Sequence, residues 1–362
     1  MNEDFLHKKI NERKEQNAYR QLRLANGAID FCSNDYLGIV KNNLLHTDTS
    51  ILASGSTGSR LLTGNYELIQ ETENAIATFH KAEAALIFNS GYDANTGLLS
   101  AVPQRGDTIL YDYLSHASIR DGVRLSFAES FSFLHNNIED LEKKLNTAKG
   151  KIFVVTESVF SMDGDEAPLK DMAALCQRFN ACLIVDEAHA TGVNGDDGEG
   201  LVQALGLQGF CFARIHTFGK ALGCHGAVIT GSNLLRDYLI NFSRPFIYTT
   251  ALPPVSVAAI AQAYKIFPSL KKERDHLKSL IDLFQSASIQ YEKLISKTPV
   301  QSVIVTGNAA VKELAAACVQ NNFDVRPILY PTVPKGKERL RVVLHSFNTT
   351  EELKGLLSVF SK

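Results

Sequence analysis

One lysine of this chain stands between two short apolar segments, in a setting that suits covalent chemistry. Lys220 lies within residues 216–223 (HTFGKALG), after the apolar run 212–215 and before the run 226–229. A lysine held among apolar residues loses its proton readily, and in that form it serves as a Schiff-base former or a general base. An ordinary surface lysine in a turn fits this segment equally well, so the other strand ends of the chain must decide.

Ionisable and polar side chains also follow three further strand-like segments. They are His116, Ser161, Asp186 and His189. In a parallel sheet, ligands bind beyond the carboxyl ends of the strands, so we expect these four side chains to gather with Lys220 at one edge. A single histidine is usually structural, but ionisable and polar side chains at the ends of four strands together favour a functional site.

Two kinds of site fit Asp186 and His189. As metal ligands they would need one or two further ligands and would leave Lys220 without a role. As cofactor contacts they fit pyridoxal phosphate, because a carboxylate pairs with the pyridinium nitrogen and a nearby histidine bonds the phenolic oxygen. Lys220 would then carry the cofactor and His116 would stack on its ring. Every strand-end group gains a role in this interpretation, so we predict pyridoxal phosphate and no metal.

A seat for the phosphate is expected where the apolar strand 84–88 runs into Ser90, Gly91 and Tyr92, just before a helix. Free backbone N–H groups and the positive end of the helix dipole favour an anion there. A plain strand-to-helix turn is the commoner explanation of such a glycine. The glycine- and hydroxyl-rich segment 54–65 matches neither a Walker loop nor GxGxxG, so we expect a loop there without assigning it a function.

The elements that must position these residues alternate between strand and helix through the middle of the chain. Strands are expected at 84–88, 108–111, 130–134, 152–156, 182–185, 212–215 and 226–229, and helices at 68–79, 118–126, 138–145, 169–179 and 234–242. Strands this apolar are buried on both faces, as in a mostly parallel sheet covered by helices on both sides. We therefore predict an α/β fold for the large domain.

The two ends of the chain form a different pattern. Helical spacing is expected over 5–24 and 255–296, strands at 300–306, 324–328 and 340–345, and helices at 309–320 and after the capping box 349–352. These elements predict a smaller α+β domain. The predicted division is 1–45 as an N-terminal segment packing with the small domain, 46–255 as the large cofactor-binding domain and 256–362 as the small domain.

Composition excludes several classes of function. The chain has 362 residues, of which 45% are hydrophobic, and its net charge is only -2, which argues against nucleic acid as a partner. Residues 1–16 are charged throughout, so they predict neither a signal peptide nor an anchor, and no apolar run is long enough for a membrane span. The six cysteines include no CxxC pair. A reduced, cytoplasmic protein is expected.

Nine motifs give the chain a family resemblance over nearly its whole length. They are SNDYLG (33–38), GSTGSRLLTGN (55–65), NSGYDAN (89–95), DYLSHASI (112–119), TESVFSMDGD (156–165), DEAHATGV (186–193), TFGKALG (217–223), YTTALPP (248–254) and PTVPKGKERLR (331–341). In these motifs and their order the chain resembles the α-oxoamine synthases, which are pyridoxal-phosphate enzymes of the fold-type I, aminotransferase-like class. The DEAHATGV form is most similar to the oxononanoate synthase branch of that family.

The resemblance implies a role for each matching residue at the cofactor. Lys220, His116 and Asp186 would be catalytic: Lys220 carries the cofactor and acts as the base, His116 stacks on the ring and Asp186 pairs with the ring nitrogen. His189 and Ser161 would contact the oxygen side of the ring. The phosphate would be bound by Gly91, Tyr92 and Thr217, joined by Thr250 or Thr249 of the partner subunit.

Substrate contacts and assembly are implied in the same way. Arg341 would bind the carboxylate of the amino acid, Asn34 and Thr332 would line the substrate site, and Arg20 matches the arginine near the acyl tail. The family forms homodimers whose active sites lie at the subunit interface, so a homodimer is expected. The substrates would be an amino acid and an acyl-CoA or acyl-carrier protein.

The reaction that the resemblance implies is a decarboxylative condensation. L-alanine would react with pimeloyl-CoA or a pimeloyl-carrier protein to give 8-amino-7-oxononanoate, CoA and CO2 in biotin synthesis. The alternatives are a glycine C-acetyltransferase (2-amino-3-ketobutyrate CoA ligase) and a serine palmitoyltransferase-like enzyme. A non-catalytic regulator that binds pyridoxal phosphate is a rival of a different class, but no helix-turn-helix with a basic face precedes Ser33.

Overall fold

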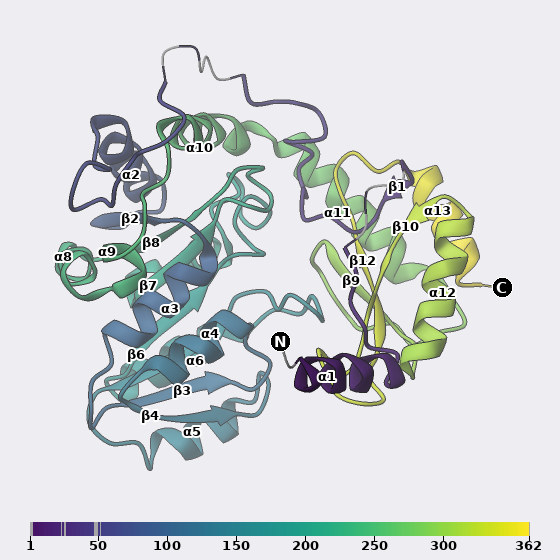
Figure 1. Cartoon of the computed structure of the whole chain (residues 1–362), viewed down its shortest axis with the longest axis horizontal. Coiled ribbons are helices and arrows are strands. Elements are labelled where there is room, and N and C mark those ends of the chain that lie inside the picture. The colour runs from purple at the N-terminus through teal and green to yellow at the C-terminus, as the bar shows by residue number, and fades with distance from the viewer. Residues whose placement is uncertain (1–2, 23, 25–26, 47–49, 51, 362) are drawn as a thin grey trace. The chain divides into compact units, whose positions relative to one another are not determined.

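The computed structural model describes residues 3–22, 24, 27–46, 50 and 52–361 (Figure 1). The chain forms two compact units: the small unit is Met1–Tyr36, Met162–Asp165 and Asp275–Lys362, and the large unit is Leu37–Ser161 and Glu166–Arg274. The changes between units therefore fall near residues 36 and 275, whereas the sequence suggested 45 and 255. The later change follows from helix α10 (Pro254–Ile266), which packs against helix α2 (Glu67–Phe79) of the large unit.

A seven-stranded sheet forms the centre of the large unit. Its strand order is β2-β8-β7-β6-β5-β3-β4. Strand β8 runs antiparallel to its neighbours β2 and β7, and the other pairs are parallel. The strands are β2 (Ala84–Phe88), β3 (Thr108–Asp112), β4 (Glu129–Phe133), β5 (Ile152–Glu157), β6 (Cys182–Asp186), β7 (Cys211–Thr217) and β8 (Ala227–Gly231). The prediction of a mostly parallel sheet is confirmed.

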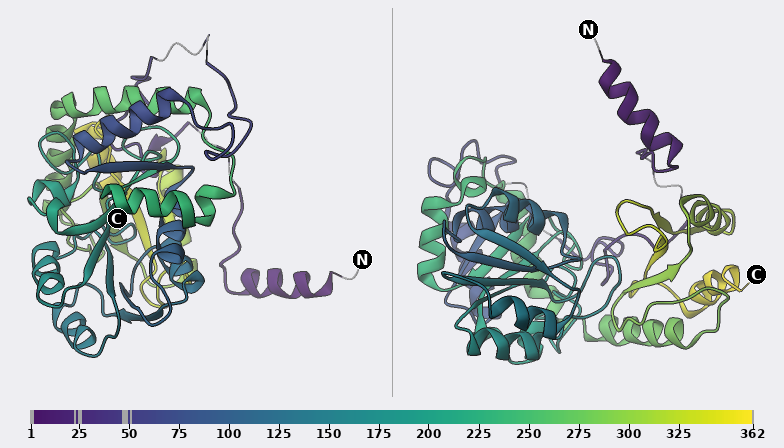
Figure 2. Two further views of the ribbon diagram at one scale, coloured as in Figure 1. Left: turned by 90° about the vertical axis from the view of Figure 1, so that its left-hand side faces the viewer. Right: turned by 90° about the horizontal axis from the view of Figure 1, so that it is seen from below.

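Helices cover both faces of this sheet, as the views of Figures 1 and 2 show. Besides α2 and α10, these helices are α3 (Gly91–Ala101), α4 (Ala117–Leu125), α5 (Ile138–Leu145), α6 (Leu169–Arg178), α7 (Leu201–Ala204), α8 (Asn233–Phe242) and α9 (Arg244–Ile247). Successive residues of one strand enter different cores: Ile109 of β3 packs with Leu98 of α3 and Val123 of α4, whereas Leu110 packs with residues of α5 and α6 such as Met172. Because helices cover both faces, strands such as β2 and β5 are buried along their whole length, whereas the edge strand β4 is mostly exposed.

The register of the strands brings their carboxyl ends to one edge. Glu157, the last residue of β5, pairs with Asp186, the last residue of β6, and Asp186 in turn pairs with Ile215 of β7. Tyr111 near the end of β3 pairs with Val155 of β5. The polar residues that follow these strands therefore begin from adjacent positions.

The small unit contains two short sheets. Strands β9 (Val300–Ile304), β11 (Arg326–Ile328) and β12 (Arg339–Val343) form an antiparallel sheet in the order β11-β12-β9, and β1 (Ile29–Asp30) pairs with β10 (Phe323–Asp324). Its helices are α1 (Asp4–Glu15), α11 (Lys271–Ser286), α12 (Asn308–Gln320) and α13 (Thr350–Val359), of which α11 begins in the large unit. The predicted capping box is present at the start of α13, between Thr349 and Glu352.

Two predicted helices are shorter than expected. The region 255–296 contains α10, a single 3-10 turn (Phe267–Ser269) and α11, which ends at Ser286. Pro268 interrupts the helical hydrogen bonds, and Lys293 Nζ donates to the carbonyl of Phe284 (2.8 Å) at the end of α11. The N-terminal helix α1 ends at Glu15 instead of continuing toward residue 24.

The expected strand 324–328 is also divided, because β10 pairs with β1 while β11 pairs with β12. In the part of the chain that the structure describes, no helix is long and apolar enough to cross a bilayer.

Candidate functional site

The loop after β7 brings Lys220 to a histidine. The Nζ atom of Lys220 lies 2.7 Å from Nε2 of His189, which is buried in the turn that follows β6. The loop is tight: the N–H of Gly223 donates to the carbonyl of Lys220 (2.9 Å), and Gly223 has a φ of +64°. The structure thus brings together two of the predicted site residues that are 31 positions apart.

Asp186 is buried at the end of β6 with a donor for each carboxylate oxygen. Its Oδ1 accepts from the N–H of Ala188 (2.9 Å), and its Oδ2 accepts from Nδ2 of Asn95 in α3 (2.7 Å). Two donors stabilise the charged form of a carboxylate, which is what a partner for a protonated ring nitrogen requires. Asn95 has no predicted role in the sequence.

His116 stands at the N-terminus of α4. Its Nδ1 lies 2.8 Å from Oγ of Ser118, whose N–H also donates to it (3.2 Å), so the imidazole caps the helix. Crowding by surrounding protein atoms lowers the pKa of His116 although the residue is exposed; Asp186 opposes this shift and Lys220 adds to it. A neutral imidazole at this place is suited to stacking on a flat ring.

Glu157 is a buried acid that the strand-end pattern contains but does not explain. Its Oε1 accepts the N–H of His116 (2.6 Å), and only 3% of the residue is exposed. Burial, with the neighbouring charge of Asp186 as a second cause, raises the pKa of Glu157 to about 8. The only signal in the sequence is its position at the end of an apolar strand, next to polar residues that do have predicted roles.

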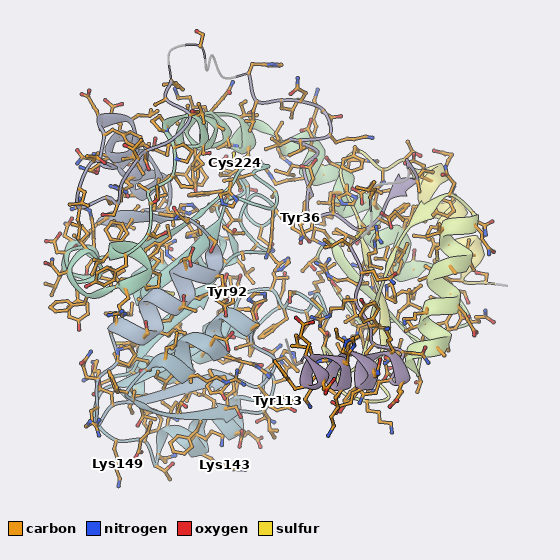
Figure 3. The ribbon with its side chains drawn as sticks, viewed as in Figure 1. Tyr36, Tyr92, Tyr113, Lys143, Lys149 and Cys224 are labelled. Atoms are coloured by element: carbon orange, nitrogen blue, oxygen red, sulfur yellow. The ribbon has the colours of Figure 1, made fainter. Side chains whose placement is uncertain are left out.

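The predicted phosphate residues meet at the start of α3. Gly91 and Tyr92 form its first turn, where backbone N–H groups point out of the helix, and Ser90 caps it by accepting from the N–H of Asp93 (3.0 Å). A β-carbon at Gly91 would lie 3.7 Å from Oγ1 of Thr217, so these two residues face each other. Tyr92, which Figure 3 labels, is exposed, and its hydroxyl donates a hydrogen bond to the carboxylate of Asp121.

The loop that carries Thr250 lies beside this turn in the same chain. Nδ2 of Asn89, the residue before Ser90, donates to Oγ1 of Thr249 (3.1 Å) and to the carbonyl of Thr250 (2.8 Å). Thr250 is itself exposed. The contact expected from Thr250 of the partner subunit stays a prediction, as does the contact of Ser161, which is half-buried at the end of a large-unit segment.

The four predicted substrate residues form two pairs in the small unit. Nη2 of Arg341 donates to Oδ1 of Asn34 (3.0 Å), which also accepts from the Tyr36 hydroxyl (3.1 Å). Nη2 of Arg20 donates to Oγ1 of Thr332 (3.0 Å). Each pair joins residues more than 300 positions apart, 307 and 312 respectively, although none of these contacts is visible in the sequence.

A cavity of about 610 Å³ lies between α1 and the Tyr330–Pro331 segment of the small unit. Its lining combines apolar residues with basic ones and one glutamate: Leu6, Lys9, Ile10, Glu12, Arg13, Gln16, Ala18, Tyr19, Arg20, Tyr330 and Pro331. Arg20, which is hydrogen-bonded to Thr332, thus lies in the wall of this cavity.

Comparison with known proteins identifies the family. The model of the aminotransferase class I and II family matches residues 26–360. The chain is 38% identical to the 8-amino-7-oxononanoate synthase of Emericella nidulans, over 99% of this chain and 95% of that protein. The solved 8-amino-7-oxononanoate synthase of Francisella tularensis has a TM-score of 0.80 at 30% identity, covering 93% of this chain and 98% of that one.

A second kind of enzyme is similar in structure. A serine palmitoyltransferase from S. paucimobilis, solved with bound PLP and myriocin, has a TM-score of 0.87 at 26% identity and covers 99% of this chain and 96% of its own.

Proposed function

Because the chain belongs to the aminotransferase class I and II family and is a pyridoxal-phosphate-dependent α-oxoamine synthase, we propose that it joins L-alanine to a pimeloyl thioester. The products are 8-amino-7-oxononanoate, CO2 and the free thiol of CoA or of a carrier protein, as an early step of biotin synthesis. The observation that carries this choice is the near-full-length similarity to relatives named 8-amino-7-oxononanoate synthase.

The donor set of the large unit fits pyridoxal phosphate. The bound cofactor supplies an electron-accepting ring that stabilises negative charge on the carbon next to the amino group. In our proposal the buried Asp186 carboxylate would pair with the ring nitrogen, His189 would hold the ring oxygen, and Lys220 would carry the cofactor. The first turn of α3 and Thr217 hold the phosphate.

Lys220 is the group that moves the proton in this proposal. Its amine would take the proton from the α-carbon of the bound amino acid. Nε2 of His189, 2.7 Å from Nζ, would orient this amine. Lys220 later returns a proton to the carbon that CO2 leaves, which makes it both base and acid.

The small-unit pairs bind the two carboxylates of the substrates. We assign the carboxylate of the amino acid to Arg341, whose guanidinium is oriented by Asn34. A pimeloyl chain ends in a second carboxylate, which we assign to Arg20, and its methylene groups to the apolar lining at Leu6 and Ile10. An acetyl or palmitoyl chain has no charge for this arginine.

The resemblance to solved serine palmitoyltransferases supports a second candidate, the condensation of L-serine with a long acyl chain. A CoA-release assay decides between them. L-alanine, glycine and L-serine are each paired with pimeloyl-, acetyl-, succinyl- and palmitoyl-CoA, with the Lys220→Ala variant as the blank. Alanine with pimeloyl-CoA should give the highest kcat/KM. A preference for serine with palmitoyl-CoA, or for glycine with acetyl-CoA, would overturn the proposed substrates.

We also propose a homodimer in which Thr250 of the partner subunit completes the phosphate site. Light scattering coupled to size-exclusion chromatography measures the mass, and Thr250→Ala should weaken cofactor binding while the dimer persists. A monomer with full activity would contradict this assembly.

A further inference from the structure

The structure joins Asp186 to His116 through two residues that have no predicted role. We propose that Asn95 and Ser118 are positioning residues, which fix the orientation of the Asp186 carboxylate and hold His116 as a neutral imidazole with its proton on Nε2. The inference rests on the proposed function only in placing the cofactor ring between these two groups.

The connection is a continuous chain of hydrogen bonds within the large unit. Nδ2 of Asn95 lies 2.7 Å from Oδ2 of Asp186 and 3.0 Å from Oγ of Ser118, which lies 2.8 Å from Nδ1 of His116. Asn95 and Ser118 are 2% and 1% exposed, so bulk water does not compete for these bonds. The chain crosses from the end of β6 through α3 to the start of α4.

The direction of each hydrogen bond follows from the donors available. The amide of Asn95 has two N–H groups, one for the carboxylate and one for Oγ of Ser118; the opposite amide orientation would set its oxygen against Asp186, acceptor against acceptor. Since Oγ of Ser118 accepts from Asn95, its own hydrogen points to Nδ1 of His116. The backbone N–H of Ser118 points to the same atom. Nδ1 therefore carries no proton.

The surrounding charges agree with this assignment. Asp186 and Asp121 favour a charged His116, but loss of hydration and the ammonium of Lys220 oppose it, and the pKa of His116 is lowered on balance. The neighbouring acid, Glu157, has a pKa raised to about 8 and is mostly protonated at neutral pH. Asp186 differs from Glu157 in having a hydrogen-bond donor at each carboxylate oxygen, from Asn95 and from Ala188.

The consequence for the reaction is that the stacked imidazole adds no positive charge that would repel the protonated cofactor or the substrate ammonium. Asn95 and Ser118 touch neither cofactor nor substrate in this arrangement. They act through the two groups that do.

Removing the hydroxyl of Ser118 tests the histidine end of the chain. Protein labelled with 15N-histidine is titrated by NMR, with and without pyridoxal phosphate, and His116→Gln identifies the signal. In Ser118→Ala the pKa of His116 should rise, and part of the neutral ring should carry its proton on Nδ1. Ser100→Ala, which removes a hydroxyl bonded only to the carbonyl of Thr96 in α3, is the matched control. An unchanged titration and tautomer in Ser118→Ala would overturn the proposal.

Changing Asn95 tests the carboxylate end. Asn95→Asp keeps the size of the side chain but replaces the donor by an acid, and Asn95→Leu removes both donors. Each should raise the dissociation constant of pyridoxal phosphate and lower kcat by about ten- to hundred-fold, while KM for the amino acid changes little. Circular dichroism verifies folding. A folded Asn95→Leu variant with normal cofactor affinity and a normal absorption spectrum of the bound cofactor would sink this part of the inference.

These outcomes separate the inference from the proposed function. If the wild-type chain releases no CoA with any pair of substrates but the His116 signals respond as described, the proposed function fails and the positioning role stands. If CoA is released and the signals do not respond, the positioning role fails alone.

Discussion

At the scale of single residues, the sequence drew attention to side chains with chemistry of their own but not to the buried residues that contact them. Lys220, Asp186 and His189 stand out because each follows a strand, and the structure brings Lys220 and His189 into contact. Asn95 and Glu157 meet the site through helix docking and strand register, which depend on contacts across 91 positions in one case. Such contacts leave no local pattern in a sequence.

Replacing the lysine should abolish the reaction. We expect Lys220→Ala to lose turnover, because it lacks the amine that we assign to receive the proton of the α-carbon, and to lose the covalent link to the cofactor. Borohydride reduction followed by peptide mass spectrometry measures the link, and CoA release measures turnover. The exposed Lys149, labelled in Figure 3, gives a control: Lys149→Ala should behave as wild type. Normal turnover in Lys220→Ala would end the proposed function.

Neutralising the ring partner should separate folding from catalysis. Asp186→Asn has the same shape, but its single acceptor oxygen cannot serve both the amide of Asn95 and the N–H of Ala188, so we expect a folded protein with a modestly lower melting temperature. Without the negative charge the ring nitrogen loses its proton, and kcat should fall on the order of 10²–10³-fold. Thermal melts and steady-state kinetics provide the two measurements. A variant with wild-type kcat would assign the ring nitrogen to another group.

Glu157 should make the stability of the protein depend on pH. Burial beside Asp186 raises its pKa from 4.5 to about 8, while His116 and Lys220 oppose the shift and Asp112 adds to it. Between these two values the folded protein keeps a proton that the unfolded chain has released. The contribution of Glu157 to the free energy of unfolding is therefore complete below about pH 4.5 and is lost as the pH rises through about 8.

The Glu157→Gln variant tests this dependence, because the amide keeps an oxygen for the N–H of His116 but cannot ionise. Melting temperatures are compared between about pH 5 and about pH 9, and the decline toward high pH should be shallower in the variant. Glu187, whose pKa burial raises to about 7, retains part of the decline. Identical profiles would show that Glu157 is ionised in the folded protein.

At the scale of helices and strands, apolar periodicity predicted where most elements lie, but it did not predict the points at which they are interrupted. The apolar strands and the capped helix α13 lie where the sequence predicts them. The helical region 255–296 is wrong in extent, because apolar spacing continues through Pro268 although the backbone hydrogen bonds do not. The division of 324–328 between two sheets depends on the partners β1 and β12, which no local pattern of that segment reveals.

The capping box of α13 offers a prediction at this scale. Oγ1 of Thr349 accepts from the N–H of Glu352 (3.1 Å), and the Glu352 carboxylate accepts from the N–H of Thr349 (2.8 Å). Thr349→Ala should therefore lower the free energy of unfolding by about 1 kcal/mol, with kcat and KM unchanged. Chemical denaturation measures the loss. Ser358→Ala, near the other end of the same helix, should have no such effect and serves as the control.

At the scale of the whole molecule, the predicted roles divide between the two compact units. The residues expected at the cofactor belong to the large unit, and those expected at the substrate carboxylates, Arg341 and Arg20, belong to the small one. The sequence indicated two domains from its change of pattern. It placed the boundaries differently because a helix such as α10 has the same periodicity in either unit, and only its packing against α2 assigns it.

Pyridoxal phosphate should stabilise the folded protein by an amount that depends on the concentration of the cofactor. A ligand present at 100 times its dissociation constant adds about 2.7 kcal/mol to the folded state. The melting temperature should rise with pyridoxal phosphate concentration in the wild type. The rise should be smaller in Lys220→Ala, which can bind the cofactor only non-covalently. Equal rises in both proteins would contradict the covalent role of the lysine.

The antiparallel course of β8 has a consequence for the order in which the site assembles. Because β8 runs against β7, the loop that carries Lys220 leaves and re-enters the sheet at the same edge, with the N–H of Phe218 bonded to the carbonyl of Gly226 (2.9 Å). Hairpins between neighbouring strands form within microseconds, whereas contacts between distant segments must first close long loops. We expect the reactive lysine to be in place early during folding, before Asp186 and Asn95 meet.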